Sequence, residues 1–266
     1  MLSLPCLQGR FPFRLGATSY VLPADVEPNV RALAGFVDDI EIVFFESEDA
    51  CPLPDLESMR TLRLIAETHA LSYTVHLPLN LCVGSPDEGA RDAAVRTCRR
   101  IISHANLFDP FAFILHLDKP GEPIPSYASL QAWRRRTADS VSRLLPKGVS
   151  PKKICIENLD YPFEWVSPLV EEMGLSICFD VGHLLLTGES PIAFLDTYGP
   201  KIRVVHLHGV KGTEDHVPVS CLAPTLLQRL YTQLSCDPSI LRVVTLEVFD
   251  AEHLRESMRT MEKLIR

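Results

Sequence analysis

The chain has 266 residues, 46% of them hydrophobic and 23% charged, which is an ordinary globular balance at a length close to that of one β/α barrel. Its net charge of −8 disfavours a nucleic-acid partner, because proteins that hold a nucleic-acid backbone present a basic surface. No apolar run reaches the length of a membrane span and the first residues lack a secretory pattern, so we expect a cytoplasmic protein with no membrane partner.

Short β-rich segments alternate with amphipathic segments along the whole chain. Eight strands, each followed by a helix, predict a single (β/α)8 TIM barrel over residues 1–266, with no second domain. A doubly wound open sheet is the rival architecture, but it usually has fewer strands and a glycine-rich first loop, which is not found after the first strand here. The expected strands are 13–19, 39–46, 72–77, 111–117, 152–157, 175–180, 202–208 and 242–249. The expected helices are 24–35, 55–69, 87–106, 127–145, 162–173, 190–198, 222–234 and 250–265.

Histidines and acidic residues recur near the carboxyl ends of the last strands. Side chains alternate between the two faces of a strand, so the face of each residue can be read from its position. Glu157, for example, lies opposite Ile154 and Ile156, and four other strands show the same separation of an ionisable residue from an apolar face. The ionisable side chains are therefore expected inside the barrel mouth, where barrel enzymes hold their active sites. They are His76, His116, Glu157, Asp180, His206 and Glu247.

This convergence predicts a metal centre. A single such residue is more often a structural hydrogen-bonding group, but six on one inward face are hard to explain in that way. Converging carboxylates repel one another and lose their hydration unless a cation neutralises them. Mixed imidazole and carboxylate donors suit zinc, with manganese, iron or cobalt as alternatives, better than magnesium or calcium. Further candidate ligands just beyond the strands are His183, Asp215 and His216.

Other candidates are weaker. Glu46, at the end of the second strand, is either an acid/base group or the partner of an inward cation. The remaining histidines fall in expected helices and are predicted to have no role in the site. They are His69, His104 and His253.

Five motifs stand in order along the chain: His76-Leu77-Pro78, Glu157-Asn158-Leu159, Asp180-Val181-Gly182-His183, His206-Leu207-His208-Gly209 and Leu246-Glu247-Val248. Together they resemble the xylose-isomerase-like barrel superfamily, which contains sugar epimerases and isomerases, inosose dehydratases and apurinic-site endonucleases. Within it, segments 16–30, 37–47, 73–78 and 115–118 resemble the cobamide-remodelling phosphodiesterase family.

The resemblance implies hydrolysis of the phosphodiester in the nucleotide loop of a cobamide, a corrinoid small molecule, to cobinamide phosphate and the lower-ligand nucleoside. It also implies about one to three divalent transition-metal ions, zinc first. The seventh loop departs from the Asp-x-His pattern of the endonuclease branch, so either Glu214 or Asp215 is the ligand there. Glu157, Asp180, His206 and Glu247 match the common metal tetrad, and His76, His116, His183 and His216 match the extra ligands of the endonuclease branch.

The expected roles follow from this reading. Glu157 is a catalytic bridging ligand, Glu46 orients the attacking water, and Tyr20 and His208 bind substrate. The loops 20–25, 47–54 and 209–220 are the expected rim of the pocket.

Three alternatives stay open. A sugar isomerase or epimerase with one divalent metal would use Glu157 and Glu247 as its acid/base pair. An apurinic-site endonuclease is disfavoured by the acidic charge. A non-catalytic corrinoid- or sugar-binding barrel would not need so many ligands, and the surplus histidines His76, His116 and His216 favour the hydrolase over the one-metal isomerase.

Overall fold

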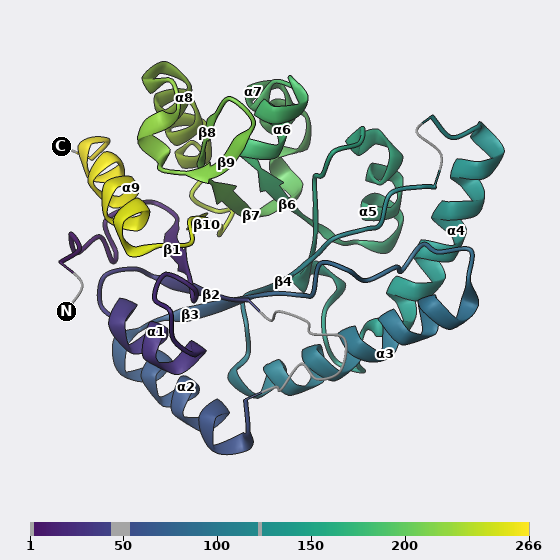
Figure 1. Cartoon of the computed structure of the whole chain (residues 1–266), viewed down its shortest axis with the longest axis horizontal. Coiled ribbons are helices and arrows are strands. Elements are labelled where there is room, and N and C mark those ends of the chain that lie inside the picture. The colour runs from purple at the N-terminus through teal and green to yellow at the C-terminus, as the bar shows by residue number, and fades with distance from the viewer. Residues whose placement is uncertain (1–2, 44–53, 122–123, 266) are drawn as a thin grey trace.

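A computed structural model describes residues 3–43, 54–121 and 124–265. Its eight parallel barrel strands close in the order β1-β10-β7-β6-β5-β4-β3-β2, so the predicted TIM barrel is confirmed (Figure 1). The strands are β1 (Arg14–Thr18), β2 (Asp39–Val43), β3 (Ser72–His76), β4 (Ala112–Leu115), β5 (Ile154–Glu157), β6 (Ser176–Asp180), β7 (Ile202–Leu207) and β10 (Val243–Leu246).

The helices lie around the strands, as Figure 1 shows. Several begin at an acidic or hydroxyl N-cap, such as Asp55, Asp87 and Ser126, whose side chain accepts a hydrogen bond from the first turn. None of the described helices is long and apolar enough to cross a membrane. The α-helices are α1 (Val26–Leu33), α2 (Leu56–His69), α3 (Glu88–Ala105), α4 (Tyr127–Leu144), α5 (Ser167–Met173), α6 (Val181–Thr187), α7 (Pro191–Tyr198), α8 (Pro224–Ser235) and α9 (Ala251–Lys263). Short 3-10 turns are η1 (Asn106–Phe108), η2 (Pro151–Lys153), η3 (Phe163–Trp165), η4 (Gly199–Lys201) and η5 (Val219–Cys221).

Two elements differ from the expected pattern, and both carry site residues. Helix α6 begins directly after β6, because Asp180 ends the strand and also caps the helix by accepting a hydrogen bond from the His183 N–H at 2.6 Å. The loop after β7 forms an antiparallel hairpin of β8 (Gly209–Lys211) and β9 (Glu214–Val217). Asp215 and His216 are therefore held on a strand rather than on an irregular loop.

The barrel interior below the site is apolar on one side, under Glu157 and Asp180, while Asp39, Thr74 and Thr245 are buried polar residues of the inward face elsewhere. Its inward side chains form a small core of their own, separate from the main core between strands and helices. Along the same inward face, Glu157 comes two residues after Cys155, and Asp180 comes two residues after Cys178. Glu157 and Asp180 therefore rest directly on a packed apolar floor, which fixes their height in the barrel. The floor consists of Phe111, Ala112, Ile114, Cys155, Cys178, Val204 and Val243.

Candidate metal centre

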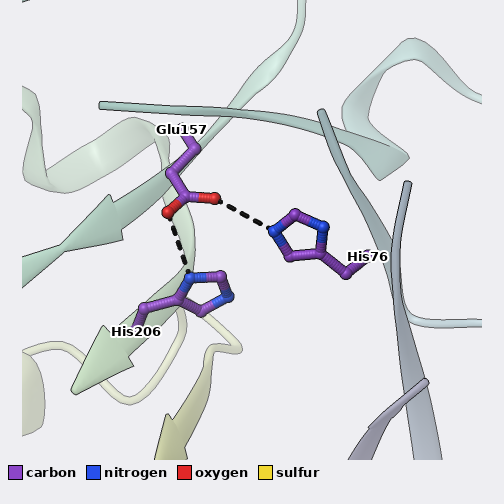
Figure 2. Close-up of side chains that lie close together, drawn as sticks. All are labelled: His76, Glu157 and His206. Carbon is purple, nitrogen blue, oxygen red and sulfur yellow. Dashed lines mark hydrogen bonds and ion pairs between the residues drawn. The ribbon is translucent and has the colours of Figure 1, made fainter. Parts of the chain in front are cut away.

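Glu157 lies at the centre of the converging side chains. Its Oε2 is 2.9 Å from His116 Nε2 and 3.4 Å from His76 Nε2. Its Oε1 is 3.3 Å from His206 Nδ1 and 3.5 Å from His183 Nδ1. Figure 2 shows His76 and His206 meeting the two different oxygens of this carboxylate. The two oxygens thus face two separate sets of imidazoles, which is the geometry of a carboxylate that can bridge two cations.

Four of the six residues predicted from the strand ends, which are also the tetrad that the resemblance implies, lie together in the barrel. Ligand atoms of Glu157, Asp180, His206 and Glu247 all lie within 4.8 Å of one another. His206 Nδ1 is 3.2 Å from Glu247 Oε2 and 3.8 Å from Asp180 Oδ2. All four side chains are buried, so the charges are largely removed from water.

Further donor groups adjoin the tetrad within the described residues. His183 forms one with Asp215 and His216, in which His216 Nε2 is 3.8 Å from Asp215 Oδ2. Glu214 is exposed and belongs to none of these groups, so Asp215 is the residue of this pair that faces the centre. His116 contacts Glu157 but joins no group of three donors. The remaining groups are His76 with Glu157 and His206, and His208 with His216 and Glu247.

Three of the histidines are oriented by backbone carbonyl groups. In each, Nδ1 lies within hydrogen-bond distance of a carbonyl oxygen, and a ring with its proton on Nδ1 donates to that oxygen and keeps Nε2 as a ligand atom. Nδ1 of His183 also lies 3.5 Å from Glu157 Oε1, and Nδ1 of His216 lies 3.6 Å from Glu247 Oε2. His216 also has a positive φ of 50°, a strained conformation that is typical of functional positions. The three pairs are His76 with Leu77 (2.8 Å), His183 with Asn158 (3.0 Å) and His216 with Glu247 (3.2 Å).

The residues fit a divalent transition metal. Glu247 Oε2 is buried and makes no hydrogen bond among the described residues, which leaves it an open electron pair. Burial raises the pKa of Glu157, but His116 and His206 outweigh this effect and hold its pKa well below the usual value. The centre thus presents ionised carboxylates beside oriented imidazoles, which is a donor set of the zinc type.

Zinc affinity should increase with pH. Burial lowers the pKa of His206, but the acidic groups around it raise the pKa well above its usual value, and the pKa of His76 and His183 is also raised. The raised pKa of these rings favours their protonated form, and a cation must displace any proton held on a ligand nitrogen. Between about pH 6 and 8 the zinc association constant should rise by up to about tenfold per unit for each proton released. Calorimetry in buffers of different ionisation enthalpy measures that release, and a pH-independent affinity would contradict the prediction.

The structure gives His208 a place other than the expected one in the substrate pocket. Its ring is fully buried, with Nε2 3.2 Å from Asp180 Oδ2 and Nδ1 3.0 Å from the backbone nitrogen of His216. It therefore links a tetrad carboxylate to the hairpin that carries His216. The buried position of the His208 ring depends on the missing side chain of Gly182, because a Cβ added there would lie 2.0 Å from His208 Cε1.

Replacing Gly182 with alanine should displace the His208 ring. The ring is held at both nitrogens and cannot move without losing those contacts, so we expect a stability loss of about 1–3 kcal/mol and a zinc affinity roughly tenfold weaker. Thermal unfolding and zinc titration measure the two effects. Gly188→Ala is a matched control for stability, because its added Cβ meets nothing but its φ of 79° is strained. Equal zinc affinity in the two variants would contradict the expected clash between the Cβ added at position 182 and the His208 ring.

The rim residues are placed only in part. Tyr20 lies in the turn after β1 and is 46% exposed, as expected of a rim residue. Glu46 lies outside the described residues, as does most of the loop 47–54. Phe249, which was not predicted, is also exposed, and its ring lies tilted at 48° to the His216 ring with the two centroids 4.7 Å apart. A cavity of about 270 Å³ opens beside the histidines and is lined by His116, Leu159, Asp160, His183, Leu186 and Thr187.

Two buried polar residues of the site were missed from the sequence. Asn158 donates to the Asp180 carbonyl oxygen at 2.9 Å and accepts from the Asp180 N–H at 2.8 Å, which fixes the end of β6. Glu41 lies inside the barrel on β2, with Oε2 3.0 Å from His206 Nε2. The alternation rule could have found Glu41, since Ile40 and Ile42 occupy the opposite face, but Glu41 lies in the middle of its strand rather than at the end.

Comparison with known proteins identifies the family. Residues 31–223 match the family described as xylose isomerase-like TIM barrel, and the chain belongs to it. A search of curated proteins gave no match. Similar solved structures include D-psicose 3-epimerase with D-tagatose from Clostridium cellulolyticum (15% identity, TM-score 0.74, 95% of this chain and 98% of that chain). Another is endonuclease IV from Thermus thermophilus (20% identity, TM-score 0.70, 94% of this chain and 99% of that chain). A third is the IOLI protein with a binding zinc atom (16% identity, TM-score 0.70, 95% of this chain and 96% of that chain). At these identities the likeness shows the fold alone.

Proposed function

We propose that this member of the xylose isomerase-like TIM-barrel family is a metal-dependent phosphodiester hydrolase, and that its substrates are cobamides. The observation that carries the proposal is the surplus of donors. The tetrad around His206 suffices for one cation, yet His183, Asp215 and His216 form a separate donor group beside it. A single-metal site has no use for this second group.

Bound divalent cations would supply an activated water and neutralise the charge that develops on the phosphate and the leaving oxygen. The chain's own part is to hold the donors in place. Glu157 separates two sets of imidazoles with its two oxygens, and Asp180 is held by Asn158 and His208. Glu46 remains a prediction as the group that orients the attacking water.

The cobamide substrate is supported by the sequence resemblance and by the apolar character of the rim. Tyr20, Leu186 and Phe249 are exposed there, and exposed apolar side chains suit the edge of a macrocycle better than a sugar. The cavity of about 270 Å³ beside His116 and His183 has the size for part of a nucleotide loop rather than for a corrin ring. We therefore propose that the macrocycle rests on the rim while the phosphodiester reaches the metals. The acidic net charge argues against a nucleic-acid substrate.

A sugar isomerase or epimerase with one divalent metal is the second candidate. Glu157 and Glu247 both approach His206 Nδ1, at 3.3 and 3.2 Å, so the two carboxylates flank one point. In a sugar isomerase or epimerase, the two carboxylates would be the acid/base pair that moves a proton beside a carbonyl group of the substrate. The similar solved structures include a D-tagatose 3-epimerase-like protein and a D-psicose 3-epimerase.

Substrate specificity separates the two candidates. Purified, zinc-loaded protein should cleave complete cobamides to cobinamide phosphate, seen by chromatography and mass spectrometry, without epimerising ketohexoses or cutting abasic DNA. Elemental analysis should give more than one metal per chain. Epimerisation of a ketohexose with a single metal and no corrinoid cleavage would overturn the hydrolase proposal in favour of the second candidate.

A further inference from the structure

His206 is held by a different kind of hydrogen-bond partner from the other ligand histidines. His76, His183 and His216 each have Nδ1 at 2.8 to 3.2 Å from a backbone carbonyl oxygen, although Nδ1 of His183 and of His216 also lies 3.5 and 3.6 Å from a carboxylate oxygen of the tetrad. In His206 it is Nδ1 that faces the tetrad carboxylates, at 3.2 Å from Glu247 Oε2, and Nε2 that points away from them. The group that meets Nε2 is the Glu41 carboxylate, with Oε2 at 3.0 Å.

The position of His206 explains why a side chain meets Nε2. His206 lies within β7 and is paired with Asp180 of β6 and Thr245 of β10, so the backbone carbonyl groups around it belong to the sheet. Glu41 reaches it from β2, which lies three strands from β7 in the barrel order β2-β1-β10-β7. The Glu41 carboxylate, which projects across the barrel interior, is thus the hydrogen-bond partner of His206, whereas the other rings have a backbone carbonyl group as their partner.

As a purely structural feature, the Glu41–His206 contact would lower the stability of the fold. Both side chains are fully buried, and Glu41 Oε1 has no hydrogen-bond partner among the described residues. A buried carboxylate with one satisfied oxygen destabilises a fold compared with an apolar residue of similar size. Its presence directly behind a tetrad ligand points to a role in that ligand's orientation.

We propose that Glu41 is a positioning residue of the metal centre. It accepts a hydrogen bond from His206 Nε2–H, which holds the proton on Nε2, fixes the ring plane and leaves the Nδ1 electron pair directed at the tetrad. The proposal rests on the metal-dependent function proposed above, and it names a group that shapes the ligand without contacting cation or substrate. Outer partners of this kind commonly change metal affinity by about 10- to 100-fold.

Zinc affinity of three variants tests the proposal, by competition with a chromophoric chelator. Glu41→Leu removes the acceptor and should weaken zinc binding by about 10- to 100-fold. Glu41→Gln retains an acceptor oxygen for Nε2–H and should recover most of this loss. Asp39→Asn is the matched control, since Asp39 is buried on the same inward face of β2 but bonds to Ser72 and Thr74 instead. Its zinc affinity should equal that of the wild type.

A second measurement, on the wild-type protein, keeps the test decisive if Glu41→Leu does not fold. Nitrogen-15 NMR of the zinc-loaded protein should show His206 with its proton on Nε2 and zinc on Nδ1, the signal being assigned by its loss in His206→Asn. The opposite tautomer, or wild-type zinc affinity in folded Glu41→Leu, would overturn the role of Glu41. A wild-type protein that binds no zinc would instead overturn the metal-dependent function itself. Zinc binding that depends on Glu41, in a protein that cleaves no phosphodiester, would leave the positioning role standing and remove only the proposed reaction.

Discussion

Glu157→Gln should abolish turnover while leaving the fold intact. The substitution keeps the shape of the side chain but removes the charge between the two sets of imidazoles, where Oε2 meets His116 and Oε1 meets His206. We expect kcat/KM to fall by at least roughly a thousand-fold, equivalent to about 4 kcal/mol of transition-state stabilisation. Asp180→Asn should behave similarly, because asparagine still caps helix α6 but contributes no charge to the tetrad.

The matched controls are two histidines outside the barrel mouth. His69 is the last residue of α2 and is exposed, and His253 lies in α9, where it pairs with Asp250 at 2.9 Å. His69→Ala and His253→Ala should leave kcat/KM within about twofold of wild type, because surface substitutions of this kind change little. Steady-state kinetics and circular dichroism on all four variants give the comparison. Activity losses in the helix variants as large as those in the strand-end variants would show that the inward residues are not the catalytic set.

Removing metal should eliminate activity and lower the stability of the protein. The buried carboxylates Glu157, Asp180 and Glu247 converge on one point, and without a cation only protons on the histidines offset their charge. A ligand at about a thousand times its dissociation constant stabilises the native state by about 4 kcal/mol. For a chain of this size we expect the Tm to fall by roughly 10 °C on chelation.

Adding back zinc, manganese or cobalt should restore both activity and Tm. Scanning calorimetry and assays before and after chelation, with elemental analysis of each sample, measure the two responses. The fall in Tm on chelation should be smaller in Glu157→Gln, because this variant already lacks the central charge that the metal neutralises. Full activity in a preparation shown to be free of metal would refute the metal requirement.

The sequence by itself determined the barrel and the inward set of site residues. Both depend on local patterns: eight β-rich segments alternating with helices, and the two-residue period that places Glu157 opposite Ile154 and Ile156. Because parallel barrel strands all end on one face, residues at these ends could be expected to meet. That expectation was met for Glu157, Asp180, His206 and Glu247.

Only the tertiary structure decided how the imidazoles are oriented and which residues support them. The pairing of Glu41 with His206 joins residues 165 positions apart and depends on barrel closure and strand register, neither of which has a local signature. The position of Asp215, rather than Glu214, beside His183 and His216 depends on the hairpin β8–β9, a short element that its surroundings stabilise. His208 shares its inward face with His206, but its burial follows from the close approach of Gly182, a contact that only the packing of α6 against β7 creates.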